Sequence, residues 1–399
     1  MGPLDIAIAG CGPAGLAAAL LLHRDGHRVR LFERFAQARP IGSGIILQPT
    51  GLAVLSALGL APATQAVGSK ITRLLGRAGA SGPVVLDVRY AALGARAGFG
   101  LGVHRAALFD ILFSAVEAAG IVIETDRTIV GRSAGDRPRL TFASGVESPP
   151  FDLVVDALGA GSAFAPPTGR ALAYGALWAS LDWPEGSALN PEALEQRYVR
   201  ASVMTGVLPI GRAPGQGRPQ AALFWSLRAD RLKDWRAAGL TAWKDEVARL
   251  WPSTEPLLAQ IDHPERLTFA RYAHRTLARP VEPGLVHIGD AWHSTSPQLG
   301  QGANMALLDA YALAKAVRET PDLPAALARY VGLRRGHVRL YQAMSAMFTP
   351  VYQSDDRLLP FVRDRLVGPI SVLWPATAIQ AGMVSGLIGS PLRRLGLAG

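Results

Sequence analysis

The stretch that decides the fold is residues 4–33, LDIAIAGCGPAGLAAALLLHRDGHRVRLFE. Residues 4–9 predict a short apolar strand, and the Ala- and Leu-rich residues 14–24 predict a helix. A second strand is expected over residues 29–32, and it ends at Glu33. A strand, a glycine-rich turn, a helix and a second strand with a terminal acid are typical of a βαβ dinucleotide-binding unit.

The turn between the first strand and the helix is a complete G-x-G-x-x-G at Gly10, Gly12 and Gly15. Gly10 permits the tight turn, Gly12 lets the backbone approach a pyrophosphate, and Gly15 lets the helix pack on the strand. The helix start offers unpaired N–H groups and a partial positive charge to the phosphates. Glu33 can accept hydrogen bonds from both ribose hydroxyls, and its charge would repel a 2′-phosphate. The nucleotide is therefore expected to be FAD or NAD rather than NADP.

A second motif lies nearly three hundred residues further on. The apolar residues 285–288 predict a strand, and residues 289–305 follow with the sequence GDAWHSTSPQLGQGANM. After Gly302 the apolar residues recur with helical period. An acid, Asp290, thus stands at a strand end, and a loop leads to a glycine-rich helix start.

Together these motifs resemble the flavin-binding signature of the p-hydroxybenzoate hydroxylase-like family. This family comprises the group A FAD-dependent monooxygenases and includes ubiquinone-biosynthesis hydroxylases. The likeness extends to residues 42–60 and to Val103-His104-Arg105, which resembles a family helix whose arginine contacts FAD. The resemblance implies an α/β fold, with a Rossmann-like FAD-binding domain, a β-sheet substrate domain and C-terminal helices.

The resemblance also implies roles for the second motif. Asp290 would bind a ribityl hydroxyl, and Pro297 would shape the loop beside the isoalloxazine ring. The helix start would face the pyrimidine edge, where its dipole stabilises the negative charge that develops on reduction. The expected cofactor-binding residues are Gly10, Gly12, Pro13, Ala14, Gly15, Glu33, Arg34, Arg105, Asp156, Gly289, Asp290, Pro297, Gly300, Gly302, Ala303 and Asn304. His293 and Pro297 are the candidates for a part in the chemistry, and for His293 a loop-structuring role is the favoured alternative.

One family motif, Asp-Gly after a strand, is altered here. The matching residues 151–162 read FDLVVDALGAGS, so that Leu158 precedes Gly159 where the family has Asp. Asp156 stands two residues earlier and could take over part of the role, although its direction along the strand would differ. In the family this motif helps both flavin and nicotinamide binding, and its alteration puts rapid reduction by NADH or NADPH in doubt.

The activity that the resemblance implies is oxygenation of a small molecule. NADPH or NADH reduces FAD, O2 adds at the flavin C4a, and the hydroperoxide hydroxylates or epoxidises an aromatic or lipophilic substrate. The cofactor supplies this chemistry and the protein supplies position and a dry cavity. Leu158 motivates the alternative, a flavin oxidase or dehydrogenase or an oxygenase fed by a separate reductase. A flavin-bound protein without activity is the third reading.

The domain order follows from the motifs. The FAD-binding domain is expected over residues 1–170 and 273–345, the substrate domain over 171–272, and a helical region over 346–399. A hairpin near residues 71–90 is expected to join the substrate domain. The pocket of the substrate domain should be mostly apolar. The candidates for its lining are Leu208, Pro209, Phe224 and Trp225, and the alternative for each is a place in the hydrophobic core.

Composition narrows the class further. The chain has 399 residues, 49% of them hydrophobic and 18% charged, which suits two joined domains with a large core. A single cysteine excludes a disulfide framework or cysteine metal site and fits the cytoplasm. The net charge of +10 comes from scattered arginines without a nucleic-acid-binding arm.

The uncharged run 367–392 is broken by Pro and Gly, so short packed helices are expected, with membrane or substrate contact as the alternative. Oligomeric state is not predicted.

Overall fold

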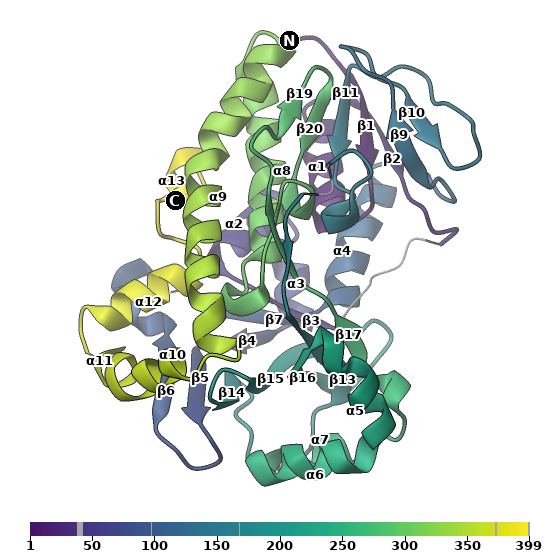
Figure 1. Ribbon diagram of the computed structural model, residues 1–399. Helices are drawn as coiled ribbons and strands as arrows, with labels where there is room; N and C mark the ends of the chain where they lie inside the picture. Colours follow the sequence, from purple (N-terminus) through teal and green to yellow (C-terminus); the bar gives the residue numbers. More distant parts are fainter. Residues whose placement is uncertain (38–42, 97, 167, 372, 398–399) are drawn as a thin grey trace.

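A computed structural model describes residues 1–37, 43–96, 98–166, 168–371 and 373–397. Gly42, at the start of the family-like stretch 42–60, and one residue of the uncharged run lie outside them. The fold has two layers of sheet joined by helices, and Figure 1 shows them one above the other. The expected α/β class, with a Rossmann-like part, a β-rich part and C-terminal helices, is confirmed.

The upper sheet is the Rossmann-like one. Within the described residues it has six strands in the order β19-β20-β11-β1-β2-β8, and all neighbours are parallel except β19 and β20. Its strands are β1 (Asp5–Ala9), β2 (Arg28–Phe32), β8 (Val122–Glu124), β11 (Leu153–Asp156), β19 (Val281–Glu282) and β20 (Leu285–His287). β20 comes from the second motif, so the sheet itself brings the two distant motifs to one edge.

Both faces of this sheet are covered, and successive side chains of each strand point to opposite faces. Ile6 and Ile8 of β1 point into the main core, whereas Ala7 and Ala9 point into a second cluster on the other face. The main core is formed with α1 (Pro13–Arg24), α4 (Arg105–Ala118), α8 (Gly302–Glu319) and α9 (Leu323–Tyr352), and the other face packs on β9 (Ile129–Arg132) and β10 (Leu140–Phe142). Helix α1 starts at Pro13, whose missing N–H costs nothing at that position.

The lower sheet, called the large sheet below, carries seven strands in the part of the chain described. Their order is β17-β13-β16-β15-β14-β5-β6, antiparallel except between β14 and β5. The strands are β5 (Arg73–Ala78), β6 (Val84–Arg89), β13 (Tyr174–Asp182), β14 (Ala193–Val199), β15 (Val203–Arg212), β16 (Pro219–Arg228) and β17 (Thr268–Ala270). Its outer face packs on the helices α5 (Leu232–Ala238), α6 (Leu240–Leu250) and α7 (Glu255–Leu258). Its inner face is turned to the Rossmann-like part (Figure 1).

Smaller elements join the two parts. One short sheet has the order β3-β7-β4 and another β12-β18-β21. Their strands are β3 (Gly44–Leu47), β4 (Ser69–Ile71), β7 (Gly100–His104), β12 (Arg170–Ala171), β18 (Ala273–Thr276) and β21 (His293–Ser294), and α2 (Pro49–Ala57) and α3 (Ala61–Val67) follow β3. Gly102 of β7 lies so close to Pro209 of the large sheet that an added Cβ would stand 1.9 Å from the Pro209 carbonyl oxygen. The short β3-β7-β4 sheet is therefore the direct bridge between the layers.

The chain after α9 folds back along the edge of the molecule in short helices. They are α10 (Leu358–Val362), α11 (Gly368–Ser371), α12 (Ala376–Val384) and α13 (Pro391–Leu395). The uncharged run is thus divided among short helices. No helix in the described ranges is long and apolar enough to cross a membrane.

Candidate active site

The glycine-rich loop has the crowding and the space that a dinucleotide requires. Gly10 has φ +103°, and an added Cβ would stand 2.7 Å from the Ala157 carbonyl oxygen. At Gly15 an added Cβ would stand 2.0 Å from the Gly10 carbonyl oxygen. At Gly12 an added Cβ meets nothing within 4 Å. Close contacts with neighbouring backbone therefore leave no room for a side chain at Gly10 and Gly15, whereas Gly12 borders open space at the start of α1.

Glu33 lies at the end of β2 and holds the same loop. Its Oε2 accepts a hydrogen bond from the Cys11 N–H at 3.1 Å, and its Oε1 accepts one from the Phe35 N–H at 3.2 Å. Each oxygen keeps a further lone pair for a ribose hydroxyl. Arg34 is exposed and lies over the Phe35 ring, 4.7 Å from its centre. Burial and the Glu33 charge raise the pKa of the Cys11 thiol to about 12, so this thiol stays protonated.

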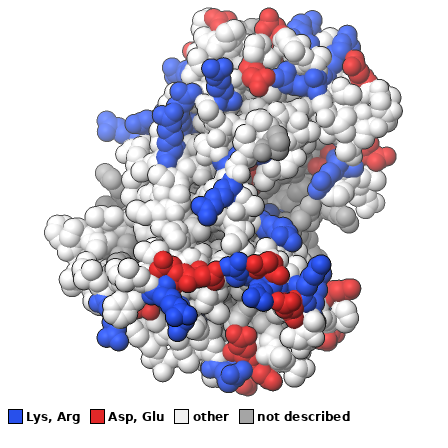
Figure 2. Space-filling model, in the orientation of Figure 1, with Lys and Arg blue, Asp and Glu red and all other residues white. Residues whose placement is uncertain are grey.

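Arg105 and Asp290 are far apart in the sequence, and each shifts the pKa of the other. Desolvation by surrounding protein lowers the pKa of Arg105, and Asp290 and Tyr272 oppose that change. Desolvation raises the pKa of Asp290, opposed by His293, Arg105 and Arg275. Both side chains nevertheless keep exposed surface. Groups that are surrounded by protein and still exposed must face a recess, and Figure 2 shows this face hollowed between the upper and lower parts.

His293 belongs to a buried ionic cluster below this recess. Its Nε2 lies 2.6 Å from Asp309 Oδ2, which also accepts a hydrogen bond from the Gly289 N–H at 2.9 Å. Arg334 Nε donates to the other Asp309 oxygen at 2.7 Å. Burial alone would raise the pKa of Asp309, but His293 and Arg334 lower this pKa to about 2. This geometry supports the loop-structuring role of His293, because its imidazole holds Asp309 and, through Asp309, the turn that carries Asp290.

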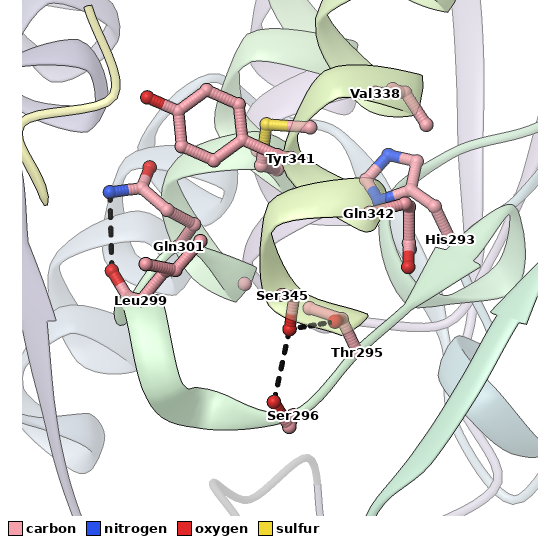
Figure 3. Close-up of a pocket in the computed structure, with 11 residues that line it drawn as sticks. His293, Thr295, Ser296, Leu299, Gln301, Val338, Tyr341, Gln342 and Ser345 are labelled. Atoms are coloured by element: carbon pink, nitrogen blue, oxygen red, sulfur yellow. Dashed lines mark hydrogen bonds between the residues drawn. The ribbon is translucent and has the colours of Figure 1, made fainter. Parts of the chain in front are cut away.

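A ring of hydroxyls ties the loop before Pro297 to helix α9. Thr295 Oγ1 donates to Ser345 Oγ at 2.6 Å, and Ser296 Oγ lies 3.0 Å from Ser345 Oγ (Figure 3). Ser296 Oγ also lies 2.7 Å from Thr349 Oγ1. His274 closes the ring with contacts to Thr295 at 3.2 Å and to Thr349 at 3.4 Å. The cavity drawn in Figure 3 has a volume of about 10 Å³, which is room for one water. It lies behind the loop and is too small for an organic substrate.

Comparisons with known proteins identify the family of this chain. A family model described as "FAD binding domain" matches residues 3–131 and 198–331. The chain belongs to this FAD-binding family. The match contains both glycine motifs, Arg105 and Asp290, and leaves out residues 132–197 and the chain after 331.

Two relatives and one solved structure show how far the likeness extends. The chain is 27% identical over 368 residues to 3-amino-4-hydroxybenzoate 2-monooxygenase of Streptomyces cremeus, with 83% of each protein covered. It is 27% identical over 407 residues to salicylate hydroxylase of Pseudomonas putida, covering 92% of this chain and 89% of the relative. The structure of Klebsiella pneumoniae HpxO complexed with FAD and uric acid superposes with a TM-score of 0.79 at 22% identity, covering 97% and 98% of the two chains, and this likeness shows the fold.

This member of the FAD-binding family is an FAD-dependent monooxygenase that uses NADH or NADPH as electron donor. The relatives favour that activity over the oxidase, dehydrogenase or separate-reductase alternative. The residues present fit FAD: the open space at Gly12 and the start of α1 suit the pyrophosphate, and Glu33 suits a ribose. Asp290 and Arg105 face the recess between the two glycine motifs, where the rest of the cofactor would lie.

The second glycine motif contributes mainly backbone. Gly300 has φ +61°, a conformation that suits glycine, and it ends the short turn that begins at Pro297, which is exposed. Gly302 and Ala303 start α8 with exposed or half-buried backbone, as a flavin contact requires. The Asn304 side chain, by contrast, is fully buried. It accepts the Gln48 N–H at 2.8 Å and donates to the carbonyls of Ile46 and Gly300, so this side chain joins β3 to α8, and the expected contribution of Asn304 to the helix start that faces the flavin is left to its backbone.

The structure directs Asp156, another expected cofactor contact, into the protein. Asp156 has no exposed surface. Its Oδ1 accepts the Leu158 N–H at 3.0 Å, and its Oδ2 lies 2.5 Å from Ser162 Oγ and 2.6 Å from His287 Nδ1. The carboxylate is directed sideways to β20 and not into the recess. Leu158, where the family has Asp, is half-buried at the end of β11.

The pocket candidates divide between the two faces of the large sheet. Trp225 packs edge-on against Trp243 of α6, with 6.3 Å between ring centres, and belongs to the outer core. Pro209 pairs with Ala221 of that same outer core. Trp225 and Pro209, which were expected to line the pocket, therefore lie on the outer face of the large sheet, and their side chains point away from the recess. Leu208 belongs to the inner core with Ile46, and the Phe224 ring packs at a tilt of 35° against Trp178, with 4.8 Å between ring centres, so both lie buried on the inner face.

Two side chains of the inner face were missed in the sequence. Trp178 Nε1 donates a hydrogen bond to the Tyr272 hydroxyl at 2.9 Å, and both residues are only half-buried. Tyr272 lies near Arg105 and so reaches the recess. Burial raises the pKa of Tyr272 to about 12, against the effect of the Trp178 hydrogen bond and the Arg105 charge. The alternation of side chains along residues 174–182 could have placed Trp178 opposite Phe224, but nothing local marks Tyr272 as its partner.

Proposed function

We propose that this enzyme hydroxylates an electron-rich aromatic ring, a phenol or a related heterocycle with apolar substituents. The observation that carries the proposal is the Trp178–Tyr272 pair on the inner face of the large sheet, next to Arg105. Ile46 connects this face to the flavin loop: it shares a core with Leu208 and would meet a Cβ at Gly300 at 2.9 Å. A planar ring between these elements would lie next to the isoalloxazine.

The chain's own residues position the ring and exclude water. Trp178 presents flat apolar surface, with the buried Phe224 ring packed against it, and the Tyr272 hydroxyl stays protonated at neutral pH because burial raises its pKa to about 12. It can therefore donate a hydrogen bond to a substrate oxygen, while its own oxygen accepts from Trp178. FAD, when bound, accepts the hydride of NADH or NADPH and activates O2. No nucleophilic side chain is required, and the relatives named above act on hydroxylated aromatic acids.

The test uses a panel of phenols, hydroxyquinolines and hydroxybenzoates with NADH or NADPH, and measures products heavier by one oxygen atom. Tyr272→Phe should raise KM for the best substrate about ten- to 150-fold, since a buried hydrogen bond to the substrate is lost, and it should leave FAD bound. Trp225→Phe, on the opposite face of the same sheet, is the matched control and should leave KM unchanged. Equal effects of the two substitutions, or no oxygenated product with any ring in the panel, would contradict the proposal.

Stopped-flow mixing also tests the electron donor. We expect either nicotinamide to bleach the flavin absorbance in the presence of substrate. No bleaching with NADH or NADPH would favour a separate reductase, which the altered Leu158 motif first suggested.

We further propose that the enzyme contacts a membrane peripherally, because an apolar aromatic substrate is concentrated there. The support is the exposed apolar surface of the C-terminal helices.

A further inference from the structure

The C-terminal helices expose an unusual amount of apolar surface. Seven large apolar side chains between 358 and 379 are each more than half exposed, and Trp374 reaches 84%. We call them the apolar patch: Leu358, Phe361, Leu366, Ile370, Leu373, Trp374 and Ile379. Elsewhere in the described residues the exposed large apolar side chains are mainly scattered ones such as Val122, Val130 and Val146. Soluble proteins rarely keep so many neighbouring apolar side chains in water without a binding partner.

The patch is not exposed for lack of packing beneath it. Arg363, 1% exposed, lies over the rings of Tyr198 and Tyr352 at 4.9 and 5.2 Å and donates to the Arg200 carbonyl at 3.0 Å. Ala381 and Val384 of α12 are buried in the inner core of the large sheet. The helices are therefore anchored by one side, and the opposite side presents the apolar patch to the surroundings.

The surface beside the patch carries more basic than acidic side chains. Its acids lie at the start of the patch: Asp355 pairs with Arg228, Asp364 pairs with Arg363, and Asp356 is exposed next to the exposed Arg357. Residues 365–399 contain no acid, and Arg365, Arg393 and Arg394 are exposed. Helix α9 also lacks acids, and its Arg335 and Arg339 are exposed. Figure 1 places α9, α13 and α10–α12 along one edge of the molecule, and Figure 2 shows Lys and Arg gathered over the upper part of that edge and bare uncharged surface over the lower part. Anionic lipid headgroups are attracted to such arginines, and Trp is favoured at the membrane–water interface.

We propose that the apolar patch docks into the surface of an anionic phospholipid bilayer, with these arginines on the headgroups. The inference rests on the peripheral membrane contact proposed above and names the surface and the lipid that make it. Short helices with protruding side chains suit a deformable lipid surface, in which they lie without spanning it. A twofold dimer through the same patch would bring the two sets of arginines near each other, which like charges oppose.

The patch and the large sheet share a wall, which links docking to the active site. Ala381 and Val384 lie in one core with Ile46 and Leu208, and Trp178 packs against that core. A substrate dissolved in the bilayer would thus meet the protein on the helices that close one side of the proposed ring-binding region. Docking itself requires no turnover, so it can be tested apart from catalysis.

The test is co-sedimentation of the FAD-loaded enzyme with vesicles of phosphatidylcholine alone or mixed with phosphatidylglycerol. We expect binding to the mixed vesicles and at least about tenfold less to phosphatidylcholine, with binding to the mixed vesicles falling as salt is raised. Trp374→Ser should lower the partition coefficient at least about tenfold, since a large apolar side chain no longer leaves water. Val122→Ser, which removes an exposed apolar side chain elsewhere, is the matched control and should bind as the wild type does.

Sedimentation velocity without lipid tests the alternative, in which a second copy of the chain covers the apolar patch in a dimer. A dimer that Trp374→Ser converts to a monomer, combined with no vesicle binding, would overturn the proposal, and so would equal loss in Trp374→Ser and Val122→Ser. Flavin absorbance in every variant reports whether the active site is intact. A failure to oxygenate any phenol would leave the vesicle result unchanged, so the two proposals fail separately.

Discussion

Replacing Gly12 by alanine should separate cofactor binding from folding. Gly12 has φ −71° and ψ 173°, which any residue adopts, and its added Cβ meets no protein atom within 4 Å. The protein without FAD should therefore fold as well as the wild type, or gain about 0.4–1 kcal/mol because alanine restricts the unfolded chain. The new methyl group would instead occupy the space that the pyrophosphate needs at the start of α1.

The magnitude follows from what the phosphate loses. If the methyl group displaces it enough to break one charge-assisted hydrogen bond, the cost is about 1.5–3 kcal/mol, or about ten- to 150-fold in Kd for FAD. Titration of the apoprotein, followed by quenching of flavin fluorescence, measures that change. Thermal unfolding of the same apoprotein measures the fold.

Gly15→Ala is the matched control, because it also adds one methyl group to the motif. Its Cβ would stand 2.0 Å from the Gly10 carbonyl oxygen, so backbone must move and the apoprotein should lose about 1–3 kcal/mol of stability. The reasoning is refuted if Gly12→Ala binds FAD as tightly as the wild type, or if both variants lower the apoprotein's unfolding temperature equally.

Two further predictions concern the second motif and the buried Asp309 that holds its turn. Asp290→Ala should weaken FAD binding about ten- to 150-fold by the same titration, and retention of full affinity would remove Asp290 from the site. The pKa of Asp309 falls from 3.8 to about 2 on folding, so its carboxylate stabilises the fold above about pH 4, and that contribution disappears as the pH falls towards 2. Asp309→Asn should cost about 3–5 kcal/mol at neutral pH, because Arg334 is left buried without its counter-charge, and should flatten the acid limb of urea unfolding. An unchanged acid limb in Asp309→Asn would show that other carboxylates determine it.

The parts of the site that could be predicted from sequence are those that depend on local backbone. Gly10, Gly12 and Gly15 have defined spacing in one turn, and the physics of that turn does not depend on distant residues. Asp290 follows a strand end, so its position at the sheet edge could also be expected. These features, with the family likeness, gave the fold class and the cofactor correctly.

Side-chain direction could not be predicted in the same way. Alternation shows that Phe224 and Trp225 point to opposite faces, but only the packing of α6 decides that Trp225 is on the outer one. Asp156 is a residue type that often binds cofactors, but its carboxylate points toward His287, on a strand 131 residues away. Tyr272 meets Trp178 across 94 residues, which no local pattern reports.

The position of β20 in the upper sheet has a consequence for how the protein is made. Strands β1 and β11 can pair once about 160 residues have left the ribosome. β20 joins β11 only after the entire large sheet has been synthesised, and Asp290 arrives with it. The nascent chain therefore carries an exposed, half-built sheet edge while some 130 residues are added. FAD should thus bind only late in translation. Chains stalled before β20 should bind chaperones.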